Sequence, residues 1–179
     1  KPVHDYESVR LLQEVTNLNL SLDPVSGMLP DGPTCFFPGA AADPNCKSLT
    51  GLRRRLERKK EAGAKFLQTQ MIMETEVLEN FCKEIANPLG LPVLAGVFLL
   101  KSARNARFIN KVVPGACIPD EIVQRLEEAK DPIEEGISIA AEQVRRYLNI
   151  VQGVHMMAVK AEKCIPLILD QAEVSSQRV

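Results

Sequence analysis

Tryptophan is absent from this sequence, and the aromatic content is otherwise limited to two tyrosines and six phenylalanines among 179 residues. A folded core must therefore be mostly aliphatic. An excess of charge of either sign is also missing, because 22 basic residues oppose 23 acidic ones and the formal net charge is -1. Nucleic-acid binding usually needs a dominant basic surface, so we do not expect a nucleic-acid partner.

Clustered metal ligands are missing too. The sequence has no C-x-x-C pair, and its two histidines, His4 and His155, lie far from any paired thiols. A zinc ribbon or an iron–sulfur cluster needs ligands close together in sequence, so no metal site is predicted. The scattered cysteines are typical of reduced thiols that serve as small apolar residues in a cytoplasmic protein. They are Cys35, Cys46, Cys82, Cys117 and Cys164.

Long hydrophobic runs are the third absence. The most apolar stretch, Leu89–Leu100, is shorter than the roughly 20 apolar residues that span a bilayer. The first residues, Lys1–Asp5, lack the hydrophobic region of a signal peptide, and the missing initiator Met favours a fragment or a processed chain. We therefore expect a cytoplasmic protein without a membrane partner.

What the sequence does contain is an alternation of helical and strand-like segments in one domain, residues 1–179. A first helix is predicted over Asp5–Asn17, with Asp5 as its cap, and a loop of turn formers follows. Predicted strands are Cys35–Ala42, Phe66–Met73, Leu91–Leu100 and Val154–Val159. Predicted helices are Leu49–Ala62, Thr75–Asn87, Ala103–Val112, Asp120–Ala129, Pro132–Val151 and Glu162–Glu173. Such β–α units predict an α/β fold with a parallel sheet.

Two architectures fit this order: an open four-stranded sheet, or half of an eight-stranded TIM-type (β/α)8 barrel. The alternation does not separate them. In a barrel, ligand chemistry gathers at the carboxyl ends of the strands, here Gly39–Asn45, Thr69–Met73, Phe98–Ser102 and Met157–Lys160. No polar catalytic cluster stands at these ends, so the catalytic residue stays unknown.

An ordered set of short segments resembles the methylenetetrahydrofolate reductases, including the reductase halves of bifunctional homocysteine methyltransferase/reductase proteins. The segments follow the family's order and spacing from about residue 5 to the end. They are Asp31–Thr34, Phe36–Ala41, Asp43–Asn45, Leu56–Gln70, Pro92–Val97, Lys101–Asn105, Val113–Pro119 and Gly153–Met157.

The resemblance implies a flavin-carrying (β/α)8 barrel of which this chain supplies the C-terminal half, strands five to eight. It implies reduction of 5,10-methylenetetrahydrofolate to 5-methyltetrahydrofolate in one-carbon metabolism and methionine biosynthesis. FAD is the expected cofactor and FMN the alternative, with a nicotinamide or an iron–sulfur partner protein as electron donor. Half a barrel leaves two unpaired sheet edges, so we expect a homo-oligomer or a complex with another chain.

Three residues are implied at the folate substrate. Gln70 ends a strand and matches a family Gln that touches folate; its amide both donates and accepts, which suits the edge of a pterin. Gln124 matches a second family Gln, and Lys160 aligns roughly with a basic substrate contact. The alternatives are a Gln satisfying backbone groups at a strand end and a solvent-facing helical Gln. His155, without an evident acidic neighbour, is predicted to be structural.

Five residues are implied at the flavin. The loop after the first strand contributes Asp43 and Asn45, and the basic helix after it contributes Arg55, Arg58 and Lys59. Guanidinium and ammonium groups suit the phosphates of a dinucleotide. The alternatives are ordinary turn formation by Asp and Asn and a solvated basic helix face.

Two departures from the family affect the cofactor prediction. Leu52 and Arg55 stand where many members have Asp and Asn, so the choice between FAD and FMN as the cofactor stays open. The rival functions are a non-catalytic half-barrel that binds a partner or assembles, and a pterin-binding methyltransferase barrel.

Overall fold

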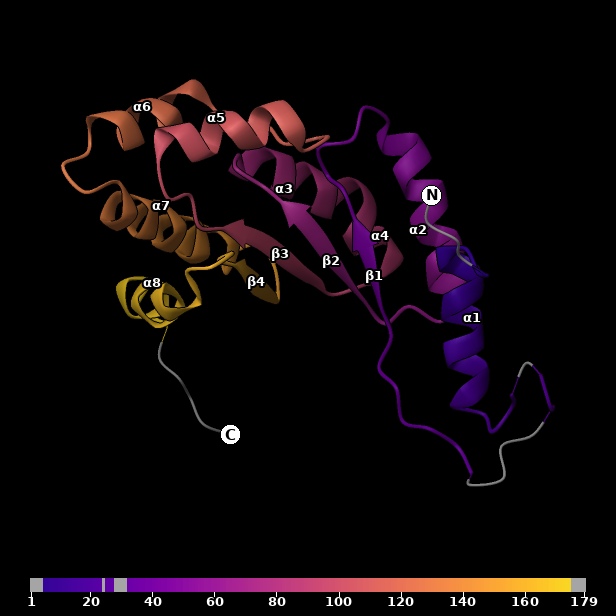
Figure 1. Ribbon diagram of the computed structural model, residues 1–179. Helices are drawn as coiled ribbons and strands as arrows, with labels where there is room; N and C mark the ends of the chain where they lie inside the picture. The colour runs from indigo at the N-terminus through magenta and orange to yellow at the C-terminus, as the bar shows by residue number, and fades with distance from the viewer. Residues whose placement is uncertain (1–4, 24, 28–31, 175–179) are drawn as a thin grey trace.

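Four parallel strands form one sheet in the computed structural model, which describes residues 5–23, 25–27 and 32–174. The strands lie side by side in chain order (Figure 1), from β1 (Gly39–Ala42) through β2 (Phe66–Met71) and β3 (Val93–Phe98) to β4 (Gly153–Met157). Each neighbouring pair is parallel. The predicted α/β fold with a parallel sheet is confirmed. Each strand overlaps its predicted segment and is shorter than it, and β4 begins one residue before its predicted start, at Gly153.

Helices connect the strands and cover one side of the sheet (Figure 1). The helices are α1 (Ser8–Leu18), α2 (Leu49–Glu61), α3 (Thr75–Phe81), α4 (Asn87–Leu89), α5 (Ala103–Val112), α6 (Asp120–Glu128), α7 (Pro132–Tyr147) and α8 (Ile165–Gln171). A π-helical segment, Cys82–Ala86, joins α3 to α4, and a 3-10 turn, Glu162–Cys164, precedes α8. Among the described helices, none has both the length and the apolar character needed to cross a bilayer.

The covered face carries the main core, and it is aliphatic as expected. Leu67 of β2, Val97 of β3 and Leu56 of α2 are fully buried there. Tyr147 and Phe81 are the largest fully buried side chains, and the others in that group are Leu, Ile and Val. A second cluster, which includes Leu100, Ile109 and Leu126, lies where α5, α6 and α7 cross the carboxyl end of the sheet.

The inner face of the sheet, opposite the helices, is largely open. Along β2, buried Leu67, Thr69 and Met71 alternate with exposed Gln68 and Gln70. Parallel sheets are normally buried on both faces, so a face with exposed amides is unusual for this class. The alternation of β2 separates a packing face from a polar face.

Three helix predictions need correction. The predicted helix Thr75–Asn87 is interrupted, because Pro88 stands inside the final turn rather than past the end. Proline has no N–H and crowds the preceding turn, and a wider π turn just before it accommodates both effects. The first helix begins at Ser8 after Glu7, so Asp5 does not cap it. The last helix begins with a 3-10 turn, and Pro166 falls in the first turn of α8, where proline is tolerated.

Candidate functional site

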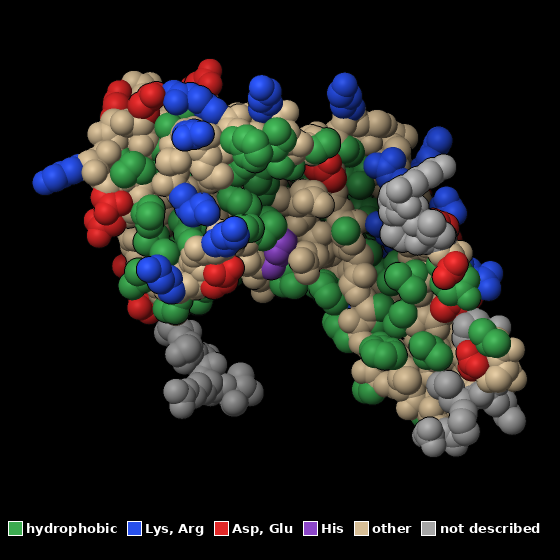
Figure 2. All heavy atoms as spheres, in the orientation of Figure 1, with side chains coloured by type: hydrophobic (Ala, Val, Ile, Leu, Met, Phe, Trp, Pro, Cys, Tyr) green, Lys and Arg blue, Asp and Glu red, His purple; other side chains and the backbone are tan. Residues whose placement is uncertain are grey.

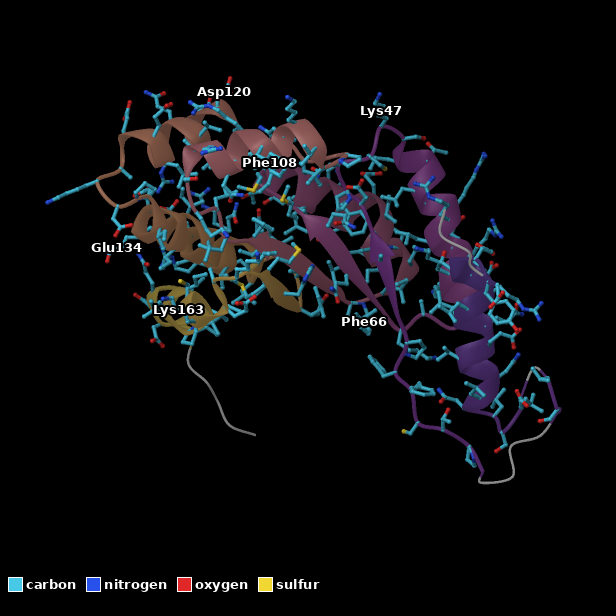
Figure 3. The ribbon with its side chains drawn as sticks, in the orientation of Figure 1. Lys47, Phe66, Phe108, Asp120, Glu134 and Lys163 are labelled. Atoms are coloured by element: carbon cyan, nitrogen blue, oxygen red, sulfur yellow. The ribbon has the colours of Figure 1, made fainter. Side chains whose placement is uncertain are left out.

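A cavity of about 440 Å³ lies on the inner face of the sheet, and we call it the inner cavity. Its lining comes from β1, β2 and β4: Gly39, Ala40, Ala41, Phe66, Gln68, Thr69, Gln70, His155 and Met157. Figure 2 shows that the molecule is hollowed between the arm carrying α1 and the arm carrying α8. Phe66, labelled in Figure 3, lies at the start of β2 on this hollow side. The small β1 residues keep the cavity open, and the two glutamines make it polar.

A bulge in β2 shapes the cavity beside Gln70. The register against β3 shifts between Gln68 and Met71, so β2 carries one extra residue there. The Thr69 hydroxyl accepts from the Gly96 N–H at 2.9 Å and donates to the Gln70 carbonyl at 2.7 Å. A side chain on Gly96 would place its Cβ 2.6 Å from the Gln70 oxygen, so only glycine fits.

His155 crosses from β4 to this bulge. Its Nε2 lies 2.7 Å from the Thr69 carbonyl oxygen, and its Nδ1 lies 3.4 Å from the Gln68 amide nitrogen. No carboxylate contacts it among the residues that the structure describes. These bonds agree with a structural histidine, and they show that it also contacts a side chain of the cavity.

The three predicted substrate residues do not share a cavity. Gln70 is exposed and lines the inner cavity. Gln124 is exposed on α6, donates to the Glu128 carboxylate at 2.7 Å and lines a separate groove of about 680 Å³ between α5 and α6. Figure 3 labels Phe108 of α5 and Asp120 of α6, which lie beyond the carboxyl ends of the strands.

Lys160 lies just after β4 and lines neither of these cavities. Its backbone is in the left-handed region, with φ of 56°, and its N–H donates to the Glu162 carboxylate at 3.0 Å. The Lys160 side chain is exposed at the carboxyl end of the sheet, which is the end where a barrel binds its ligands.

Asp43 and Asn45 order the loop after β1. The Asp43 carboxylate accepts from the Asn45 N–H at 3.1 Å, and the Asn45 amide donates to the Met71 carbonyl at 3.0 Å, which ties the loop to the end of β2. Asn45 also lines a third cavity, of about 560 Å³, together with Glu74 and Cys117. Both residues thus have turn-forming bonds, and Asn45 faces a cavity at the strand ends.

The basic residues of α2 lie at the outer edge of β1. The Ser48 hydroxyl caps this helix by accepting from the Gly51 N–H at 3.1 Å. Lys59 is half-buried and its ammonium donates to the Ala41 carbonyl at 2.9 Å. Burial lowers the pKa of Lys59 below its ordinary value, and the nearby Arg55 charge lowers this pKa further.

Arg58 and Arg55 are exposed on the same helix. Arg58 forms an ion pair with Glu7 at 3.7 Å, between two well-exposed side chains. Leu52, at a position where the resemblance implied a polar residue, is buried in the main core, so this position contributes packing only.

Beside Lys59 lies an apolar cavity of about 340 Å³ that we call the edge cavity. α1 contributes Leu11 and Val15, and the segment before β1 contributes Phe36 and Phe37, which are 54% and 72% exposed. The edge cavity and the inner cavity share residues 39–41 of β1. Lys59 and Gln70 thus occupy adjacent cavities that flank one strand, whereas Arg58 lines neither.

Sequence reasoning missed Gln68 and the bond between Gln68 and His155. The signal for Gln68 was present, because residues two apart in a strand share a face and Gln70 was already a candidate. No local signal reveals the contact with His155, which is 87 residues away. Within the described ranges, no three His, Cys, Asp or Glu side chains gather closely enough to hold a metal ion.

Comparison with known proteins places the chain in a family. A solved structure titled as an uncharacterized protein from Clostridium thermocellum that binds two copies of 5-methyl-5,6,7,8-tetrahydrofolic acid is similar, with a TM-score of 0.58 and 18% identity. The match covers 76% of this chain and 54% of that one, so this chain spans about half of its length. At this identity the likeness concerns the fold. Comparison with curated proteins gave no match. The family model described as methylenetetrahydrofolate reductase matches residues 29–173, and the chain belongs to this family.

Proposed function

We propose that this chain is the C-terminal half, strands five to eight, of a (β/α)8 barrel that reduces 5,10-methylenetetrahydrofolate to 5-methyltetrahydrofolate. The observation that carries the proposal is the open inner face of β2, where Gln68 and Gln70 are exposed in a cavity of about 440 Å³. A sheet face that serves only packing would be apolar. The similarity to a structure that binds 5-methyltetrahydrofolate supports a reduced folate as the ligand.

Gln70 orients the pterin in this proposal. Its amide donates and accepts at once, which matches a pterin edge that presents ring nitrogens, a carbonyl and an amino group. The bulge at Thr69 and the close approach of Gly96 fix the Gln70 backbone, so its side chain starts from a rigid position. Orientation against the reacting partner is what such a residue contributes to rate.

The residues of the edge cavity and of α2 fit part of a flavin dinucleotide, its phosphates above all. The edge cavity is at the small end of the range for ligand pockets, about 300–1,000 Å³, so it accommodates part of a dinucleotide. Lys59 at its rim and exposed Arg58 and Arg55 on α2 supply positive charge for phosphates, and Asp43 and Asn45 order the loop beside them. When bound, flavin supplies the hydride equivalents for the reduction. We propose FAD, with FMN as the alternative.

The sheet edges support a missing half. Just before the two strands, the Pro38 carbonyl accepts from the Lys65 N–H at 2.8 Å. Backbone groups alternate in direction along a strand, so the carbonyls of Ala40 and Ala42 also face β2, whereas the Ala41 carbonyl faces outward. The Lys59 ammonium donates a hydrogen bond to this outward-facing carbonyl. We propose that the first half of the barrel, from the same chain, a second copy or another chain, pairs along this edge. A nicotinamide or an iron–sulfur protein supplies electrons in a cytoplasmic setting.

Calorimetric titration of the chain with 5-methyltetrahydrofolate tests the folate site. We expect the Gln70→Leu variant to bind about tenfold more weakly, because one lost hydrogen bond in a site is worth about 1–2 kcal/mol. Gln13→Leu, at an exposed position on α1, is the matched control. Gln124→Leu tests the second predicted substrate residue. Equal affinity of wild type and Gln70→Leu would contradict the assignment.

The rival function is a non-catalytic half-barrel that binds a partner, and exposed Phe36 and Phe37 beside the free edge favour it. The absorbance spectrum and gel filtration distinguish the two functions. A yellow protein that binds folate supports the reductase. A colourless protein that binds no folate but elutes as an oligomer supports the rival.

A further inference from the structure

We infer that His155 is a positioning residue that turns the Gln68 side chain so that its carbonyl oxygen faces the inner cavity, where it accepts a hydrogen bond from an N–H group of a pterin. The inference rests on the proposed function for the identity of the ligand. It adds a specificity-determining residue, Gln68, and a reason for the orientation of that residue.

The first step is the position of the proton on His155. Its Nε2 lies 2.7 Å from the carbonyl oxygen of Thr69, and a carbonyl oxygen only accepts hydrogen bonds. Nε2 must therefore carry the proton. In a neutral imidazole the other nitrogen, Nδ1, then has a lone pair and accepts.

The second step fixes the amide of Gln68. The Gln68 side chain meets the bare Nδ1 at 3.4 Å, and two acceptors would repel each other there. The amide NH2 group must therefore face His155, independently of how the two ends of the amide are assigned. The carbonyl oxygen points the other way. Gln68 is exposed and lines the inner cavity, so this oxygen is available to a ligand.

The third step is the ligand. Gln68 and Gln70 stand two residues apart on the same face of β2, about 7 Å along a strand. Among the described residues that line the inner cavity there is no Asp, Glu, Lys or Arg, so recognition there depends on neutral hydrogen bonds. The amide N–H and the amino group of a pterin are neighbouring donors. The oriented Gln68 oxygen suits this donor edge, and a ring without these N–H groups would leave the oxygen unpaired.

The binding test uses 5-methyltetrahydrofolate as the probe and a double-mutant cycle. We expect Gln68→Leu to weaken binding about tenfold and His155→Phe to weaken it several-fold. His155→Phe should add nothing in the Gln68→Leu background, because it acts through Gln68. Gln68→Glu keeps an acceptor oxygen but loses the NH2 group that meets Nδ1, so it should weaken binding at least as much as His155→Phe does. Wild-type affinity in Gln68→Leu, or additive effects of the two changes, would overturn the inference.

A second measurement needs no ligand. Nitrogen-15 NMR of the imidazole rings reads which nitrogen carries the proton, and His4→Ala assigns the only other histidine. We expect His155 to be protonated at Nε2 in the wild type. The Gln68→Leu variant should remain folded, and its His155 should lose the contact at Nδ1. A proton at Nδ1 would overturn the inference even if folate binds. A correct tautomer in a chain that binds no folate would instead overturn the proposed function and the pterin assignment.

Discussion

The two faces of β2 differ in what their side chains do. Leu67 on the covered face is fully buried, whereas its neighbour Gln68 on the inner face is exposed beside His155. The period of two residues along a strand places packing on one face and the proposed ligand contacts on the other. Stability and binding are therefore separable by single substitutions one residue apart.

Alanine substitutions at these two neighbouring positions of β2 should have the largest difference in effect on stability. We expect Leu67→Ala to lower the free energy of unfolding by about 2–5 kcal/mol, because it leaves a cavity in the main core. Gln68→Ala should change it by no more than about 0.5 kcal/mol. Urea denaturation measures both values. Similar losses for both variants would show that the inner face is packed in solution.

Alkaline pH should lower the free energy of unfolding through Cys82, a buried residue of the main core. Burial raises the pKa of the Cys82 thiol from 9.0 to about 11. The native state therefore holds a proton that the unfolded state releases, so the contribution is complete below about pH 9 and is lost as pH rises through about 11. A shift of this size corresponds to about 2–3 kcal/mol.

Urea midpoints measured from about pH 8 to about pH 11 check this expectation, because this range extends from below the unfolded pKa of the thiol to its folded pKa. Cys82→Ala should flatten the alkaline decline, whereas Cys117→Ala, at an exposed position, should leave it unchanged. An identical decline in wild type and Cys82→Ala would mean that other groups cause it. The comparison uses slopes, because Cys82→Ala also alters packing at neutral pH.

The sequence predicted what depends on local pattern. The four strands follow from periodicity. The cap of α7 by Asp131 and the positive φ of Gly63, just past the C-cap of α2, likewise agree with the conformations that these residue types favour. Asp131 accepts from the N–H groups of Ile133 and Glu134. Each of these features is decided within a few residues.

Contacts between distant strands were not predictable in this way. The bulge at Thr69 depends on Gly96 of β3, and the orientation of Gln68 depends on His155 of β4. The same limit applies to Gln124, because only the placement of α6 decides that it faces a different groove from Gln70. Residue types suggested the members of the site, and tertiary structure determined which of them meet.

A smaller loss of stability is expected when the hydrogen bond between α7 and the end of β2 is removed. The Tyr147 hydroxyl of α7 donates to the Ile72 carbonyl at 2.7 Å in a buried setting. Tyr147→Phe should cost about 1–3 kcal/mol, because a buried carbonyl loses its donor. Tyr6→Phe, at an exposed position, is the control and should change little. Equal stability of both variants would mean that another donor replaces the hydroxyl.

The smallest expected change in stability concerns the outer edge of β1, where Lys59 donates to the Ala41 carbonyl. Charged groups at a sheet edge oppose pairing with other strands. Lys59→Met should alter the free energy of unfolding by about 1 kcal/mol or less, yet raise self-association by freeing this carbonyl. Arg58→Met is the matched control on the same helix, because its ion pair with Glu7 joins two exposed side chains and contributes about 0–1 kcal/mol. Sedimentation velocity over a concentration series measures association. If both variants associate equally, the edge of β1 is not where copies meet, and the proposed pairing of a first barrel half along this edge would be wrong.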